Sequence, residues 1–145
     1  MTANVVLDVM PTDTQILGFG NIWYEAALLN ASLIQLPSGK SIRMVSAPYF
    51  LITKLSAFDG RGGGDYQMSH DIEDIVAVLD GRPELLDEVK QSEPVLAKEL
   101  AGRFQRLLKD RRFIDAVAGH MPPDETSQAR VTISLKIMNG IAKNT

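Results

Sequence analysis

The sequence predicts an α+β fold, with a small and mostly antiparallel sheet at the N-terminal end followed by a C-terminal bundle of helices. β-Branched and apolar runs bounded by turn residues are confined to the first third of the chain. The remainder carries apolar residues at helical spacing, separated by capping residues, glycine and proline. We expect a single domain over residues 1–145, because the chain can bury one core and no composition break divides it.

The predicted strands come first. Residues 4–10, NVVLDVM, form an apolar run that stops at a proline, as a strand does. Residues 31–36 and 41–46 flank the sequence PSGK, in which Gly39 suits a tight turn. These two runs therefore predict a hairpin, and a short helix is expected before them over residues 23–30.

The predicted helices begin at residue types that favour a helix start. Pro48 suits the first turn of a helix that reaches Phe58, and Ser69 suits the cap of a second helix that ends at Gly81. Further helices are expected at 83–91, begun by Pro83, at 93–110, at 111–120 and at 129–142, the last one capped by Thr126 or Ser127.

Composition excludes several classes of site. The chain has no cysteine, and its two histidines, His70 and His120, lie far apart, which argues against thiol chemistry and histidine-rich metal sites. A net charge of −3 argues against general nucleic-acid binding. The sequence shows neither a signal peptide nor an apolar run of about 20 residues, so we expect a cytoplasmic protein without a membrane partner.

Two glycine-containing stretches look like phosphate loops but lack the required context. Gly39-Lys40-Ser41 matches the end of a Walker A motif, yet Ile34 stands where the motif needs its first glycine, and a strand is expected to follow. The run of Gly62, Gly63 and Gly64 follows a helix rather than a strand. We interpret this second stretch as a flexible joint between two helices.

Charged residues on the two helices that flank this joint are the more informative feature. Lys54 and Arg61 are seven residues apart, about two turns, and would share a face of the first helix if that helix extended to Arg61. Asp71 and Asp74 share a face of the second. If the helices pack side by side, these faces meet, either as solvated surface charges or as a phosphate-binding lysine held by Asp74.

Asp8 is a further candidate, since it interrupts the apolar run at residues 4–10. Strands alternate their faces, so this carboxylate can simply point to solvent. Alternatively, it is a ligand for Mg²⁺, which proteins hold with one or two carboxylates together with substrate phosphates.

These motifs together resemble the AbiEii-type nucleotidyltransferase family, the toxins of type IV toxin–antitoxin systems. The family carries a lysine, an alanine and an arginine on one helix and then an aspartate, matched here by Lys54, Ala57, Arg61 and Asp65, ahead of the acidic helix. The resemblance covers about residues 4–90. It implies that residues 1–80 form part of a polymerase-β-like nucleotidyltransferase core, with residues 81–145 as the helical C-terminal part.

The resemblance implies transfer of a nucleotide from an NTP to a hydroxyl acceptor, such as a tRNA end or a protein side chain. Lys54 and Arg61 would contact the triphosphate, and Asp74 or Asp65 would orient Lys54 or accept a proton. Asp8 would be the third carboxylate of the Mg²⁺ site. An antitoxin would be a further partner.

One departure from the family leaves alternatives open. The family's Gly-Ser step followed by Asp-x-Asp, which supplies two metal carboxylates, does not occur in these 145 residues. The chain can be a shortened product without transfer activity, can take carboxylates from a second chain, or can begin inside a longer protein. In the first case it would act as a dimeric binding or regulatory module, because an open strand edge and apolar face invite pairing. An antitoxin-like binder of a partner is a third reading.

Overall fold

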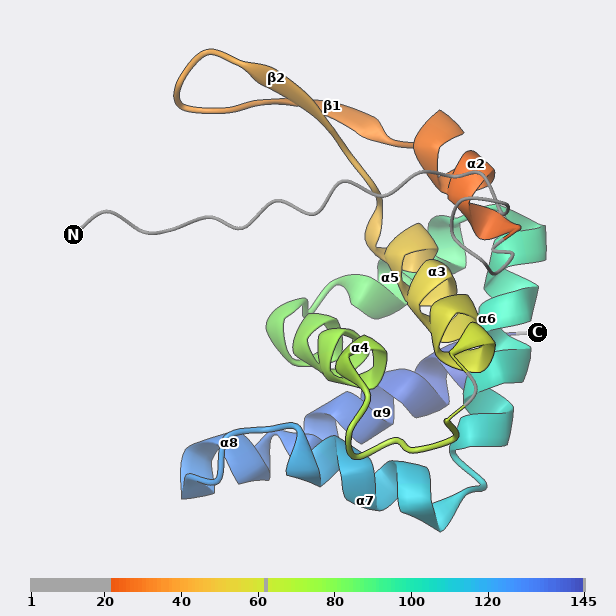
Figure 1. Cartoon of the computed structure of the whole chain (residues 1–145), viewed down its shortest axis with the longest axis vertical. Coiled ribbons are helices and arrows are strands. Elements are labelled where there is room, and N and C mark those ends of the chain that lie inside the picture. Colours follow the sequence, from red (N-terminus) through yellow and green to blue (C-terminus); the bar gives the residue numbers. More distant parts are fainter. Residues whose placement is uncertain (1–21, 62, 145) are drawn as a thin grey trace.

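The computed structural model describes residues 22–61 and 63–144. In this part the chain forms one two-stranded antiparallel sheet and a larger set of helices, which confirms the α+β class (Figure 1). The strand expected at residues 4–10, together with Asp8, lies outside the described residues. The wider nucleotidyltransferase core therefore stays a prediction.

The predicted hairpin is confirmed. Strand β1 (Ser32–Gln35) pairs with β2 (Ser41–Met44), and Ile34 lies opposite Ile42. Gly39 has φ 83°, a left-handed conformation that favours glycine, and its N–H donates to the Leu36 carbonyl at 2.9 Å. Because β2 and not a helix follows Lys40, the Walker A likeness is accidental.

Two helices flank the hairpin along the chain. Helix α2 (Trp23–Leu29) precedes it and packs on α3 (Ala47–Gly60). Pro48 lies in the first turn of α3, as predicted, where its missing N–H leaves no helical bond unmade.

Helix α4 (His70–Gly81) begins as predicted: the Ser69 hydroxyl accepts a hydrogen bond from the backbone N–H of Ile72 at 3.2 Å. Helix α5 (Leu85–Gln91) begins two residues later than expected. The prediction of a start at Pro83 was wrong because Arg82 to Leu85 form a turn, in which the Leu85 N–H donates to the Arg82 carbonyl at 3.1 Å.

The remaining helices are α6 (Pro94–Leu107), α7 (Arg111–Gly119), α8 (Glu125–Ala129) and α9 (Val131–Ala142). The predicted cap by Thr126 or Ser127 was wrong. Asp124 caps α8 instead, accepting from the backbone N–H of Ser127 at 2.9 Å and from its hydroxyl at 2.7 Å. The expected single helix is divided at Arg130, which separates α8 from α9.

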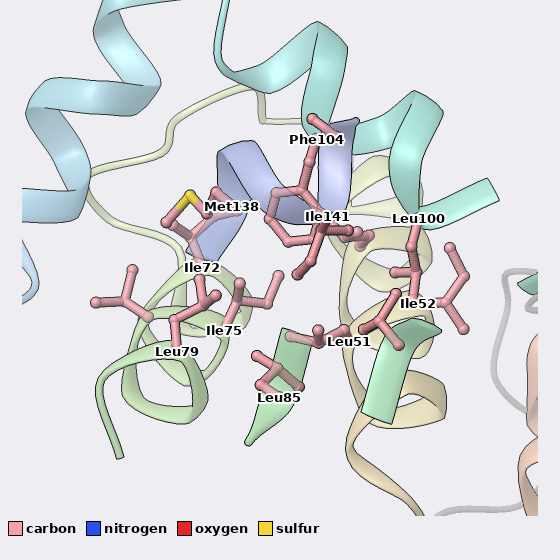
Figure 2. Packing of buried hydrophobic residues seen from close by; sticks show 14 of the residues in the cluster. Leu51, Ile52, Ile72, Ile75, Leu79, Leu85, Leu100, Phe104, Met138 and Ile141 are labelled. Atoms are coloured by element: carbon pink, nitrogen blue, oxygen red, sulfur yellow. The ribbon is translucent and has the colours of Figure 1, made fainter. Parts of the chain in front are cut away.

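We call α3 to α9 the helical body, and it contains nearly all of the hydrophobic core, to which α2 adds Ala27 (Figure 2). Helix α3 contacts α2, α4, α5 and α6, and α9 packs against α4, α5 and α6. Buried side chains form the inward faces of three of these helices: Leu51 and Leu55 of α3, Ile72, Ile75 and Leu79 of α4, and Leu96, Leu100 and Phe104 of α6. None of the helices in the described ranges is long and apolar enough to cross a bilayer.

Candidate functional site: the charged cluster between α3 and α4

The charged faces of α3 and α4 meet, as the sequence predicted. Nζ of Lys54 lies 2.6 Å from Oδ2 of Asp74 and 3.6 Å from Oδ1 of Asp71. Nε of Arg61 lies 3.4 Å from the other oxygen of Asp71. The two cations, two helical turns apart, are therefore joined through one carboxylate. We call Lys54, Arg61, Asp71 and Asp74 the charged cluster.

Asp71 is the residue whose importance the sequence reading missed. Its side chain is 4% exposed, and it is the one buried charged residue within the part of the chain that the structure describes. Charged side chains are rarely buried unless they are paired, and Asp71 is paired on both oxygens. The burial could not be recognised in the sequence, because the helix dipole favours an acid in the first turn of a helix whether or not it is buried.

Asp65 does not join the charged cluster. Its Oδ1 accepts hydrogen bonds from the backbone N–H groups of Gln67 and Met68, at 3.0 and 3.2 Å. Asp65 therefore closes a turn in the chain between α3 and α4, as aspartates often do. It still lines a hollow of about 260 Å³ together with Arg61 and Asp71, so it lies beside the charged cluster without an ion pair to Lys54.

The joint between α3 and α4 is fastened at Tyr66. The Tyr66 ring stacks on Phe58, with centroids 5.2 Å apart, and meets the Phe113 ring edge-on at 5.5 Å. Its hydroxyl donates to Asp110 at 3.3 Å, and Nε2 of His120 lies 2.7 Å from its carbonyl oxygen. Burial is the main cause that raises the pKa of Tyr66, and the negative charge of Asp110 raises it further. The hydroxyl therefore stays protonated and acts as a donor. The segment that follows Gly64 is therefore held at Tyr66 against α3 and α7.

His70 and Trp23 lie outside the charged cluster. His70 lies at the surface, with Nδ1 3.0 Å from a carboxylate oxygen of Glu73, so it forms a pair on its own helix and no triad. Trp23 is half-buried and packs against the hydrophobic core.

A cavity of about 410 Å³ lies beside the charged cluster, between α2 and α3. Lys54, Arg61 and Asp71 line it, and Tyr24, Leu28 and Phe50 form an apolar and aromatic part of its wall. This size falls in the range of small-molecule sites. Asp74 is not part of the lining, so the cavity itself is bounded by two cations and one acid.

A larger hollow of about 700 Å³ lies between the hairpin and α5, but it lacks comparable chemistry. Its one cation is Arg82, which forms a two-pronged pair with Glu88 at 2.6 to 3.0 Å. We therefore take the smaller cavity as the candidate site.

The described residues do not fit a metal centre. Within residues 22–61 and 63–144, no three histidine or acidic side chains converge to hold an ion. Asp71 already faces a cation from each side, and Asp74 is engaged with Lys54. The expected Mg²⁺ therefore depends on Asp8, which the structure does not describe.

Comparisons of the chain with protein-family models, with curated proteins and with solved structures find no match. The likeness to AbiEii-type nucleotidyltransferases therefore rests on the quoted residues alone.

Proposed function

We propose that this chain is a nucleotidyltransferase-like protein of the AbiEii toxin type, and that the cavity between α2 and α3 binds the phosphates of an NTP. The observation that carries the proposal is the charge around this cavity. Lys54 and Arg61 both line it, while the single acid in its lining, Asp71, is buried and in contact with both cations.

This arrangement suits phosphate binding because the cations are held in place before a ligand arrives. Asp71 fixes Arg61 from one oxygen and Lys54 from the other. The side chains of Lys54 and Arg61 remain 27% and 53% exposed, so both keep donors toward solvent. Charge-assisted bonds from lysine and arginine are the usual way in which proteins bind phosphate oxygens.

The reaction would join the hydroxyl oxygen of the acceptor, a tRNA end or a protein side chain, to the α-phosphorus of the NTP. The bond from that phosphorus to the pyrophosphate oxygen would break, and pyrophosphate would leave. Lys54 and Arg61 would stabilise the charge on the phosphate oxygens. Asp74, whose Oδ2 lies 2.6 Å from Nζ of Lys54, is better placed than Asp65 to orient Lys54. The proton of the acceptor would pass to Asp74 or to Asp65. Asp8 would be a ligand of the Mg²⁺ that such a reaction is expected to need.

Isothermal titration of the chain with each NTP tests the proposal. We expect saturable binding that Lys54→Ala weakens at least tenfold, because about 1.4 kcal/mol corresponds to that factor and charged hydrogen bonds contribute about 1.5–3 kcal/mol. Lys98→Ala, which removes an exposed lysine of α6, is the matched control and should bind as the unmodified chain does. An unmodified chain that binds no NTP would contradict the proposal.

A second candidate function, a dimeric binding module without transfer activity, is favoured by the hairpin. Leu33 is 73% exposed, and Ile42 and Met44 are 43% and 46% exposed. An isolated hairpin is marginally stable, so burial of these apolar side chains against another surface would stabilise it.

The edge of β1 is the side on which a second copy would pair. The N–H of Leu36 donates to the Lys40 carbonyl at 2.7 Å, and hydrogen-bonded pairs alternate along antiparallel strands. The backbone groups of Leu33 and Gln35 therefore point away from β2. The sequence of β1 has no charged residue, whereas Arg43 lies in β2, and charges on an edge discourage pairing.

Light scattering, which measures the oligomeric state, tests this second function. A dimer that Leu33→Lys converts to a monomer would support it, since a two-fold axis would bring the new lysines close together. Ile133→Lys, at another exposed apolar position on α9, should leave the dimer intact. A monomeric unmodified chain would exclude the dimeric module.

A further inference from the structure

We infer that the larger hollow of about 700 Å³, between the hairpin and α5, is a docking surface for another protein, and that the docked segment is an amphipathic helix with basic side chains. This surface is separate from the charged cluster, and the inference does not depend on nucleotide binding. It uses the face of the hairpin opposite to Leu33 and leaves the edge of β1 free.

The two faces of the hairpin differ in polarity. Residues that stand directly opposite each other in an antiparallel pair share a face, and the faces alternate along each strand, so Ile34, Ile42 and Met44 lie together. Leu33 stands opposite Arg43 and lies on the other face. We call Ile34, Ile42 and Met44 the apolar face of the hairpin.

The apolar face continues into the larger hollow. Met44 lines the hollow at the base of the hairpin, which projects away from the helical body (Figure 1). Val45 and Phe50 extend the apolar wall to α3, and Val78 adds to it from α4. Ile42 does not line the hollow and is 43% exposed, so a small molecule confined to the hollow would leave it uncovered. A protein segment is long enough to cover both parts.

The charged side chains of the hollow leave one acid without a counterion. Arg82 and Glu88 neutralise each other through their two-pronged pair. Glu93, the N-cap residue of α6, is exposed and makes no capping hydrogen bond, and it forms no ion pair within residues 22–61 and 63–144. Burial is the main cause that raises the pKa of Tyr49, and the charge of Glu93 raises it further, so this carboxylate lies near the Tyr49 hydroxyl in the wall of the hollow.

An amphipathic helix with basic residues fits both features of this surface. Its apolar side chains would cover the apolar face of the hairpin and the wall of the hollow, and a lysine or arginine beside them would pair with Glu93. Asp87, which is exposed and stands four residues before the lining residue Gln91, adds a negative charge on the same side of α5. An acidic helix would be repelled by these two carboxylates.

Fluorescence anisotropy with two labelled peptides tests the inference. Each peptide has about 14 residues, with leucines at helical spacing, and the two carry either lysine or glutamate at the remaining positions. We expect the unmodified chain to bind the lysine peptide at least about tenfold more tightly than the glutamate peptide, because only the lysine peptide complements the charge of Glu93 and Asp87.

Two pairs of variants locate the bound peptide. Ile42→Ser should weaken binding of the lysine peptide about tenfold, whereas Leu33→Ser, on the other face of the hairpin, should leave it unchanged. Glu93→Gln should weaken it about threefold, as expected for an exposed ion pair. Glu125→Gln, which removes another exposed acid at the start of a helix and changes the net charge equally, should have no effect.

Three outcomes would overturn the inference. The first is equal binding of the two peptides, or no binding of the lysine peptide. The second is an equal loss in Ile42→Ser and Leu33→Ser, which would show that the peptide does not dock on the apolar face of the hairpin. The third is a dimer of the chain that Ile42→Ser makes monomeric, since the occupant would then be a second copy. None of these outcomes changes the expected result of the NTP titrations.

Discussion

The helical body and the hairpin differ in how their apolar side chains are covered. In the helical body, Leu51, Leu100 and Phe104 are all 0% exposed, whereas Leu33 of the hairpin is 73% exposed. The helical body thus encloses a hydrophobic core, although Val95 and Ile133 are exposed on it. The hairpin, in contrast, leaves most of the Leu33 side chain open to solvent or to a partner. The candidate cavity lies where the two meet, since α3 supplies its cations and Val45, at the end of the hairpin, supplies part of its apolar wall.

The largest expected effect tests whether the core of the helical body is packed as described. Phe104→Ala should lower the free energy of unfolding by about 3–5 kcal/mol, because it opens a cavity among fully buried side chains. Val95→Ala, on the exposed side of the same helix, should change it by less than about 0.5 kcal/mol. Urea denaturation measures both, and similar values for the two variants would show that α6 is not packed as described.

The second prediction concerns the buried acid of the charged cluster. Asp71→Asn should destabilise the chain by about 2 kcal/mol, since it leaves Lys54 and Arg61 facing a neutral side chain. Asp74→Asn removes the 45% exposed acid and should lower stability by at most about 1 kcal/mol. The reverse order of effects in thermal unfolding would mean that Asp74, not Asp71, holds the cations.

Two buried serines of the helical body provide a third, smaller test. The Ser134 hydroxyl has no hydrogen-bond partner among the described residues, whereas the Ser127 hydroxyl donates to Asp124 at 2.7 Å. Ser134→Ala should therefore raise the free energy of unfolding by about 1 kcal/mol, and Ser127→Ala should lower it by about the same amount. Equal losses in the two variants would show that the Ser134 hydroxyl is bonded in solution.

The smallest effect is expected in the hairpin. Leu33→Ser should change stability by less than about 0.5 kcal/mol if the side chain is exposed in solution as it is in the structure. Denaturation at two protein concentrations measures the effect. A large loss, greater at high concentration, would instead show that a second copy covers Leu33, as the second candidate function requires.

The helices could be predicted where a local signal was unambiguous. Ser69 precedes an apolar run of helical period and caps α4 as expected. The start of α8 was missed because Asp124, Thr126 and Ser127 are all capping residues, and only the fold shows which of them faces the N–H groups of the helix. The choice between such neighbours depends on burial, and Ser127 is buried.

The charged cluster could be predicted in part. The spacing of Lys54 and Arg61 correctly placed them on one face, and their meeting with the acids of α4 followed from helix packing. The depth of Asp71 did not follow, because burial depends on the whole fold. The anchoring of Tyr66 by Asp110 and His120 was also beyond the sequence, since those contacts join residues 44 and 54 positions apart.

The most direct test of the central claim, that Lys54 faces a bound nucleotide, is chemical labelling of lysines followed by mass spectrometry. Lys54 is 27% exposed and should react with an acylating reagent in the unbound chain. Saturating NTP should then protect Lys54 while leaving the labelling of the exposed Lys98 unchanged. Equal labelling of Lys54 with and without NTP would contradict the account.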